Sequence, residues 1–270
     1  MSSRPMVTVD GVAPALLARE LVGLVLHERR RHPGRLRLRV ALSSDLLRDP
    51  RQGPGLRLGA LVGATFEPDD AAWGFEGTVR AINVRRPQDG GPVVLVDVED
   101  GLGRLRTGPR TRTWHDVGET DLVSRIAAEH GLGAQVDDLP GVHRFVRQEA
   151  VSDLAFLQTR AEAVGHDLWV HGQTLHQGPP GRRSSAHLGL RFGQELVTAS
   201  VRTSHADGDD DAPRTHVTGE TVATPAPVVG CTVSVTGVAP WVDERVHRVT
   251  AARHTYDSQG LRTRFRASAD

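Results

Sequence analysis

The sequence contains no lysine and one cysteine, Cys231, and these scarcities exclude several kinds of site. All 33 basic residues are arginine. No single functional site would require the complete absence of lysine, so this composition indicates nothing about function. A lone cysteine excludes an internal disulfide framework and a cysteine-rich zinc site. Because the surrounding "VVGCTVSVTG" alternates in polarity like a strand, we expect the Cys231 thiol to lie in a buried core.

An excess of charge and a long apolar run are also missing. The 33 acidic residues balance the basic ones, so no global field draws the chain to nucleic acid or membrane, and binding to either would need a local patch. We therefore expect no nucleic-acid binding. The longest aliphatic run, "LVGLVL" at 21–26, is too short to span a bilayer, and the first residues lack the apolar core of a signal peptide. We expect synthesis in the cytoplasm without a signal peptide and no membrane segment.

What the sequence does contain is a succession of short strands. With 270 residues, of which 38% are hydrophobic, the chain can bury the core of one large domain or of two to three small ones. Alternating segments near 35–40, 56–66, 74–84 and 92–100 are separated by Gly- and Pro-rich turns. Strands at this spacing are typical of a barrel or small sandwich.

The densest basic stretch, "HERRRHPGRLRLR", begins at His27. Within 35–40 the apolar residues fall on one face of the expected strand and the arginines on the other. We interpret these arginines as a solvated face rather than as a phosphate-binding strip.

Between 113 and 180 the pattern changes to amphipathic helices. "ETDLVSRIAAEHG" favours a helix with Thr120 as its N-cap and Gly131 just past its end. A second helix is expected from the N-cap Ser152 to the stop at Gly165. Both helices present one apolar face, so we expect them to be docked on another part of the fold.

The stretch "GHDLWVHGQTLHQG" at 165–178 carries three evenly spaced histidines. Gly172 and Gln173 suit a two-residue hairpin turn, which pairs Trp169 with His176 across the strands. His166 would then point away from the other two, so three ligands cannot converge as tetrahedral zinc requires. His171 and His176 remain the weak candidates for a metal site, and a Trp169–His176 cross-strand pair is the favoured interpretation.

After this hairpin the sequence predicts a linker at 178–189 and a return to strands. The segment 204–227 has no apolar period and contains "DGDDD", which indicates an exposed, mobile loop. That run lacks the spacing of a calcium loop. The fold class is therefore α+β, mainly β, with a first β-barrel domain at 1–112, a helical insert with a hairpin at 113–180 and a second β-barrel domain at 181–270.

No catalytic motif is present in the sequence. A nucleophile elbow, a zinc-protease helix, a phosphate loop and a dinucleotide-binding glycine pattern are all absent. Pairs such as Asp97 and Glu99 could be chosen as catalytic carboxylates only arbitrarily. We therefore expect no catalytic residue, no cofactor and no enzymatic activity.

Three segments together resemble the late control D family, the baseplate hubs of contractile phage tails and contractile injection systems, related to the hub part of VgrG. The first is "VVLVDVEDGLGRLRTGPRTRTWHDVGETDLVSRIAAEHGL" (93–132). The second is "QEAVSDLAFLQTRAEAVGHDLWVHGQTLHQGPP" (148–180), and the third is "VHRVTAARHTYDSQGLRTRFRA" (246–267). The residues that carry the likeness, as structural positions, are Ser152, Phe156, Leu157, Gly165, Trp169, Gly172, Leu175, His176, His254, Tyr256, Asp257, Thr263 and Phe265.

This resemblance implies a structural virion component rather than an enzyme. Three copies would form a ring in which six similar barrels surround a channel, and the ring would adapt a sixfold tail tube to a threefold central spike. The implied partners are two further copies, a spike protein, a tail tube or tube-initiator protein and other baseplate proteins. Because no spike domain follows Asp270, the resemblance favours a separate hub, assembled into a phage tail or injection particle.

Two other hypotheses belong to different classes. A cell-wall hydrolase module at a tail tip would act on peptidoglycan through a specific Asp, Glu or His. A carbohydrate- or cation-binding β module would bind calcium or cell-wall sugars without turnover.

Overall fold

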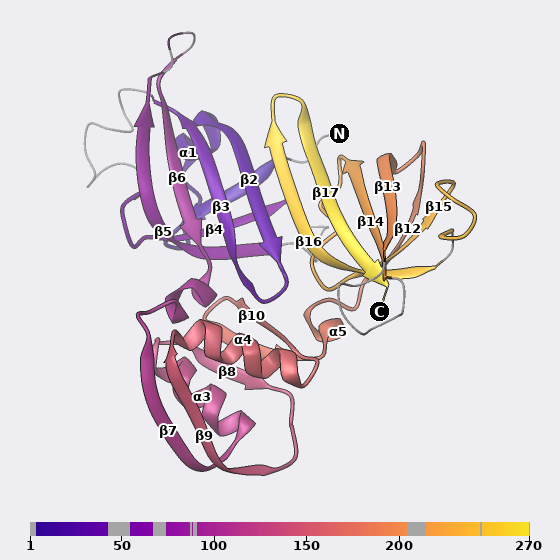
Figure 1. Ribbon diagram of the computed structural model, residues 1–270. Coiled ribbons are helices and arrows are strands. Elements are labelled where there is room, and N and C mark those ends of the chain that lie inside the picture. Colours follow the sequence, from indigo (N-terminus) through magenta and orange to yellow (C-terminus); the bar gives the residue numbers. More distant parts are fainter. Residues whose placement is uncertain are drawn as a thin grey trace.

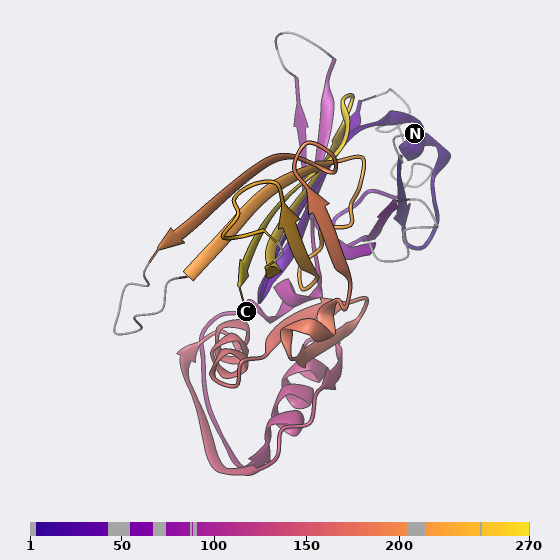
Figure 2. The same ribbon diagram turned by 90° about the vertical axis from the view of Figure 1, so that its right-hand side faces the viewer.

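The computed structural model describes residues 4–42, 55–66, 74–86, 88, 91–204, 214–243 and 245–269. Figure 1 shows three parts: an N-terminal and a C-terminal group of strands side by side, and a helical region at one end of both. The view in Figure 2 places the helical region at the same end. No helix among the described residues is long and apolar enough to span a bilayer.

The N-terminal group follows the predicted alternation of polar and apolar residues. In β3 the residues Leu36, Leu38 and Val40 are buried, and the arginines between them are exposed, because successive side chains of a strand point to opposite faces. The elements are β1 (Pro5–Val9), α1 (Ala15–Glu20), β2 (Leu21–Arg29), β3 (His32–Ala41), β4 (Leu61–Phe66), β5 (Gly74–Arg85) and β6 (Val93–Glu99).

The C-terminal group corrects two predictions. The prediction of a loop at 204–227 is wrong for Arg214–Val222, which form a strand, β14, between β13 and β17. The acidic run at 207–211 lies outside the described residues. The prediction of a linker at 178–189 is also wrong in part, because Pro180–Arg183 form a short helix, α5, and β12 begins at His187. The strands are β12 (His187–Arg191), β13 (Leu196–Ser204), β14 (Arg214–Val222), β15 (Thr232–Thr236), β16 (Val246–Asp257) and β17 (Gly260–Ala269).

The strand β14 escaped prediction because its residues are mostly polar. Only Val217 and Val222 are aliphatic, yet Val217 and Thr221 are fully buried. The ladders to β13 on one side and β17 on the other hold the segment extended. Tertiary pairing therefore decides the structure of this segment, not its own hydrophobic pattern.

The two groups share one sheet. Antiparallel β2 and β16 pair from Ala251 opposite Arg29 to Tyr256 opposite Leu24. Within the described residues the sheet has 12 strands, with the main path β1-β4-β5-β6-β3-β2-β16-β17-β14-β13. Among the described strands, no pairing between the ends of this path closes the sheet into a barrel. The predicted fold class, α+β and mainly β, is confirmed.

The helical region has its own core and two small sheets. One sheet is the ribbon β7–β9, which the sequence analysis did not predict, and the other has the order β10-β11-β8. Buried residues of both long helices, including Leu122, Ile126 and Leu157, pack together there. The elements are η1 (Gly101–Leu105), β7 (Arg110–Gly118), α3 (Glu119–Glu129), β8 (Gly133–Val136), β9 (Val142–Val151), α4 (Asp153–Ala163), β10 (Asp167–His171), β11 (Thr174–Gly178) and α5 (Pro180–Arg183).

The predicted helix boundaries are correct at three of four ends. Ser152 caps α4, because its hydroxyl accepts a hydrogen bond from the Ala155 N–H at 3.2 Å. Gly131 and Gly165 follow the two helices with φ of +68° and +71°, the left-handed conformation that glycine adopts without strain. The predicted N-cap of α3 is wrong: Thr120 lies inside the helix, and Gly118 holds the cap position.

The expected core position of Cys231 is confirmed, and it leads to a chemical prediction. The residue is fully buried among apolar neighbours of the C-terminal group, and burial raises the pKa of its thiol to about 11. Because the thiolate is the reactive form, we expect Ellman's reagent at pH 8 to leave the native protein unmodified and to titrate one thiol after unfolding in guanidinium. Rapid modification of the native protein would contradict this placement.

Candidate functional site

The turn between β2 and β3 joins the sheet to the helical region. The Nε of Arg30 donates to both carboxylate oxygens of Asp167, at 2.8 and 3.0 Å, and the Asp167 side chain is only 1% exposed. Arg31 donates to the His166 carbonyl at 3.2 Å and pairs with Glu162 at 2.6 Å. Two arginines of the densest basic stretch therefore belong to an internal joint, which local sequence pattern did not reveal.

A second joint lies where β6 leads into η1. The Asp100 carboxylate accepts hydrogen bonds from the backbone N–H of Gly34 at 2.7 Å and of Leu102 at 3.0 Å. Burial raises the pKa of Asp100 to about 7, against the opposite effect of these hydrogen bonds. A Cβ at position 34 would lie 2.9 Å from the carboxylate, so this close approach requires glycine.

Further contacts hold the same regions together. Gln173, at the tip of the β10–β11 hairpin, donates to Glu76 of β5 at 3.0 Å. Arg183 of α5 pairs with Glu28 of β2 at 2.6 Å, and both side chains are largely buried. The helical region is thus tied to the sheet from several elements, which makes it a fixed part of the fold.

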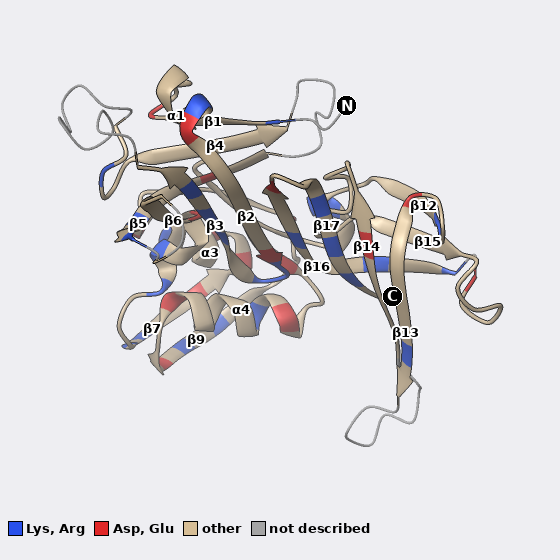
Figure 3. Cartoon of the chain, turned by 90° about the horizontal axis from the view of Figure 1, so that it is seen from above, with Lys and Arg blue, Asp and Glu red and all other residues tan. Residues whose placement is uncertain are grey.

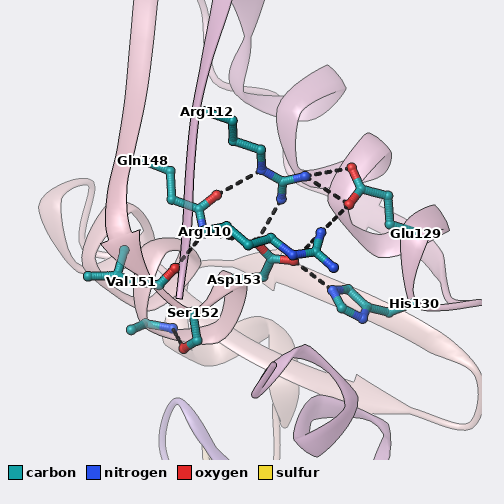
Figure 4. A network of polar contacts seen from close by, with 9 residues as sticks. Arg110, Arg112, Glu129, His130, Gln148, Val151, Ser152 and Asp153 are labelled. Carbon is teal, nitrogen blue, oxygen red and sulfur yellow. Dashed lines mark hydrogen bonds and ion pairs between the residues drawn. The ribbon is translucent and has the colours of Figure 1, made fainter. Parts of the chain in front are cut away.

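A buried carboxylate organises the inside of the helical region, as Figure 4 shows. Asp153 is fully buried and accepts hydrogen bonds from Arg112 at 2.7 Å, His130 at 2.8 Å and Gln148 at 2.9 Å. Arg110 lies 3.2 Å away. Burial alone would raise the pKa of Asp153, but the hydrogen bonds from His130 and Gln148 and the arginine charges outweigh it and lower that pKa. The network joins β7, β9, α3 and α4 around the buried Asp153 carboxylate, and the half-exposed Glu129 pairs with the same two arginines.

The hairpin forms in the predicted register. Trp169 pairs with His176, Val170 with Leu175 and His171 with Thr174, and Gly172 turns the chain with φ +57°. The predicted Trp169–His176 pair is confirmed: the rings stack with centroids 5.2 Å apart and planes 8° apart. Burial, followed by the charge of His171, lowers the pKa of His176.

Within the described residues, the two weak metal candidates His171 and His176 are not part of a three-ligand group. Among the residues that the structure describes, no group of three or more His, Cys, Asp or Glu side chains is arranged to hold a metal ion. His171 and His176 instead line a cleft of about 1230 Å³ between the helical region and both strand groups. Phe66, Arg182 and Arg183 form other parts of its wall.

The other resemblance positions are mainly packing and hydrogen-bonding residues. Phe156 stacks on Trp114 with a centroid distance of 5.4 Å, and His254, fully buried, lies 3.0 Å from the Thr263 hydroxyl. Leu157, Leu175 and Phe265 lie in cores, Tyr256 packs edge-on to Phe66, and Asp257 pairs with Arg262.

Sequence comparison gives the family. The model of the Alg8 N-terminal domain family matches residues 54–207, more than half of the 270 residues. The chain belongs to the Alg8 N-terminal domain family. The matched span includes the whole helical region, with Asp153 and Asp167, whereas Arg30, the partner of Asp167, lies before it.

Solved structures share the fold of this Alg8 N-terminal domain protein over almost its full length. A Neisseria meningitidis tail protein matches with a TM-score of 0.77 at 11% identity, covering 100% of this chain and 97% of its own. The 43 kDa tail protein of a Shewanella oneidensis prophage matches with 0.73 at 11%, covering 99% and 97%. The Escherichia coli c3393 protein, a component of the type VI secretion system, matches with 0.73 at 13%, covering 97% and 76%. No curated protein matches the sequence.

Proposed function

We propose that the protein is a structural baseplate hub of a contractile phage tail or phage-tail-like injection system. In this proposal three copies form a ring that receives the tail tube on one side and seats a separate central spike on the other. The observation that carries the proposal is the fold shared, nearly end to end, with tail proteins of two bacteria and with a type VI secretion component.

The internal organisation supports a rigid ring subunit. The first and last strand groups are joined into one sheet by β2 and β16, and the helical region is fixed to it through the Arg30–Asp167 and Arg183–Glu28 pairs. We propose that the domains 1–112, 113–180 and 181–270 act as two barrel-like ring modules and a connecting insert. Two similar modules in each of three copies would supply six units against a sixfold tube.

The late control D family is the hub class that we assign, on the three sequence segments described above. Its positions act structurally in this proposal: they pack, cap and turn the chain around a protein–protein surface. A non-enzymatic role fits this use of the histidines, since His176 stacks on Trp169 and His254 bonds to Thr263. The partners would be the spike, the tube or its initiator, and other baseplate proteins.

The trimer is the first consequence to test. Native mass spectrometry of the purified chain, alone and with the spike and tube proteins encoded beside it, is expected to give three copies of the 29.2 kDa chain or a three-to-three complex with the spike. A monomer at every concentration, without any complex, would contradict the hub assignment. Turnover of peptidoglycan in the same preparation would instead favour the hydrolase hypothesis.

A further inference from the structure

An arginine-rich groove crosses the middle of the continuous sheet, on the face opposite the buried core. It has a volume of about 440 Å³, and its lining comes from β2, β3, β14, β16 and β17. Figure 3 shows blue segments on β3, β16 and β17, which together with β2 form the run β3-β2-β16-β17 of the sheet. The basic residues of the groove are His27, Arg29, His32, Arg35, Arg253, Arg264 and Arg266.

Strand register aligns four of these side chains in one row. Arg264 lies opposite Arg253, Arg253 opposite His27, and His27 opposite Arg35. Because paired residues point to the same face and strands lie about 4.8 Å apart, the row spans roughly 14 Å. Arg29 and Arg266 flank Ala251 in the adjacent row.

Among the described residues, carboxylates pair only with the two ends of the row. Glu220 pairs with Arg264 at 2.6 Å, and Glu99 lies 3.5 Å from Arg35. In the part of the chain that the structure describes, Arg29, Arg253 and Arg266 have no carboxylate partner. Like charges directly opposite each other destabilise a sheet, so this arrangement has a cost that an external anion would offset.

The histidine in the row is affected by this positive field. Burial, followed by the charges of Arg253, Arg35 and Arg37, lowers the pKa of His27. Burial disfavours the charged imidazole most, and the nearby arginine charges act in the same direction.

We propose that this groove binds the phosphate backbone of double-stranded nucleic acid. Guanidinium groups match phosphate geometry and stay charged at every physiological pH. The groove lies in the middle of a sheet, where backbone N–H and C=O groups are used by ladders, so it cannot recognise a peptide by strand addition. Single strands are bound on exposed aromatic platforms, and Phe265, the aromatic residue of the groove, is buried.

This inference goes beyond the hub proposal and does not depend on it. It also departs from the expectation of no nucleic-acid partner, which rested on a net charge of zero. Net charge averages the whole surface, whereas the cross-strand register concentrates arginines from segments more than 200 residues apart. The local patch that the sequence analysis required is therefore present on the sheet.

The test measures how salt affects binding of the full-length protein to a fluorescent DNA duplex of about 20 base pairs, by anisotropy. If three unpaired arginines contact phosphates, the slope of log K against log salt is about −2.7, so binding weakens about 40-fold between 50 and 200 mM salt. We expect Arg253→Gln alone to reduce the slope by about 0.9 and the triple variant Arg29→Gln/Arg253→Gln/Arg266→Gln to remove most of it.

A matched control changes net charge equally at other exposed sites. The variant Arg57→Gln/Arg147→Gln/Arg182→Gln replaces side chains that are 61%, 54% and 64% exposed and lie outside the groove, and it should bind DNA like the unaltered protein. Failure to bind DNA, or equal losses in both triple variants, would overturn the proposal. So would tighter binding of polyglutamate than of DNA, which would indicate an acidic protein partner. Native mass spectrometry of each variant measures its oligomeric state, so a failure of the proposed trimer can be told apart from a failure of DNA binding.

Discussion

Asp153→Ala is expected to destabilise the protein by about 3–5 kcal/mol, because it removes a buried carboxylate on which several donors converge. Arg110 and Arg112 would keep only the half-exposed Glu129 as a carboxylate partner. Arg112, Gln148 and His130 all direct hydrogen bonds to this carboxylate, and the Gln148 and Asp153 side chains are fully buried. Urea unfolding followed by circular dichroism and by tryptophan fluorescence, to which Trp114 beside the network contributes, measures the loss.

The neighbouring Glu149→Ala is the matched control. Glu149 also pairs with an arginine, Arg147, but its side chain is 67% exposed, and exposed pairs contribute only about 0–1 kcal/mol. Equal losses in the two variants would refute the special role of Asp153.

Acid should reduce the difference between the unaltered protein and Asp153→Ala by removing the part that depends on the Asp153 charge. The folded-state pKa of Asp153 is lowered from the ordinary value of 3.8. Its carboxylate therefore stabilises the fold fully above that value, and the contribution disappears as pH falls below 3.8 through the lower folded pKa. Unfolding curves at stepwise lower pH below 3.8 would show the gap between the two proteins narrowing. A gap that widens as the pH falls below 3.8 would be inconsistent with this origin.

Asp167→Ala is expected to weaken the attachment of the helical region to the sheet, at a cost of about 3 kcal/mol. The Asp167 side chain is 1% exposed and receives the Arg30 guanidinium, so its loss leaves a partly buried cation unpaired. Hydrogen exchange should accelerate in β10, β11 and the β2–β3 turn, while the ladder between β16 and β17 stays protected.

The matched control for this joint is Asp137→Ala. Asp137 pairs with Arg182 on the same side of the hairpin, but the two side chains are 28% and 64% exposed. We expect a change below about 1 kcal/mol and unaltered exchange at the β2–β3 turn. Fast exchange confined to β8 after Asp167→Ala would contradict the proposed attachment.

Local pattern predicted most of the elements that contain strong periodicity. The alternating strands around Leu36 and Phe75, the helices around Ile126 and Leu157, and the hairpin register at Gly172 needed only spacing, caps and turn residues. The same rules failed where residues are polar but enclosed. β14 is rich in threonine, and β7 and β9 show mixed polarity, so their pairing depends on partners far along the chain.

The candidate joints were missed for a related reason. Arg30 and Asp167 are separated by 137 positions, and neither has a local spacing that distinguishes it from a solvated charge. Asp153 had a weak signal, since it follows the N-cap Ser152 and suits the first turn of a helix, but its burial could not be inferred. The arginine row likewise exists only in the register between β2 and β16.

The pairing of β2 with β16 also determines the order of events during biosynthesis. Residues 21–29 leave the ribosome early, yet their partner strand occupies 246–257, so one edge of β2 stays unpaired until nearly the whole chain has been made. An uncovered edge strand is a template for wrong pairing and aggregation, and contacts over such a separation form slowly. Truncation anywhere before β16 should therefore leave the nascent N-terminal half dependent on chaperones, with its arginine row not yet assembled.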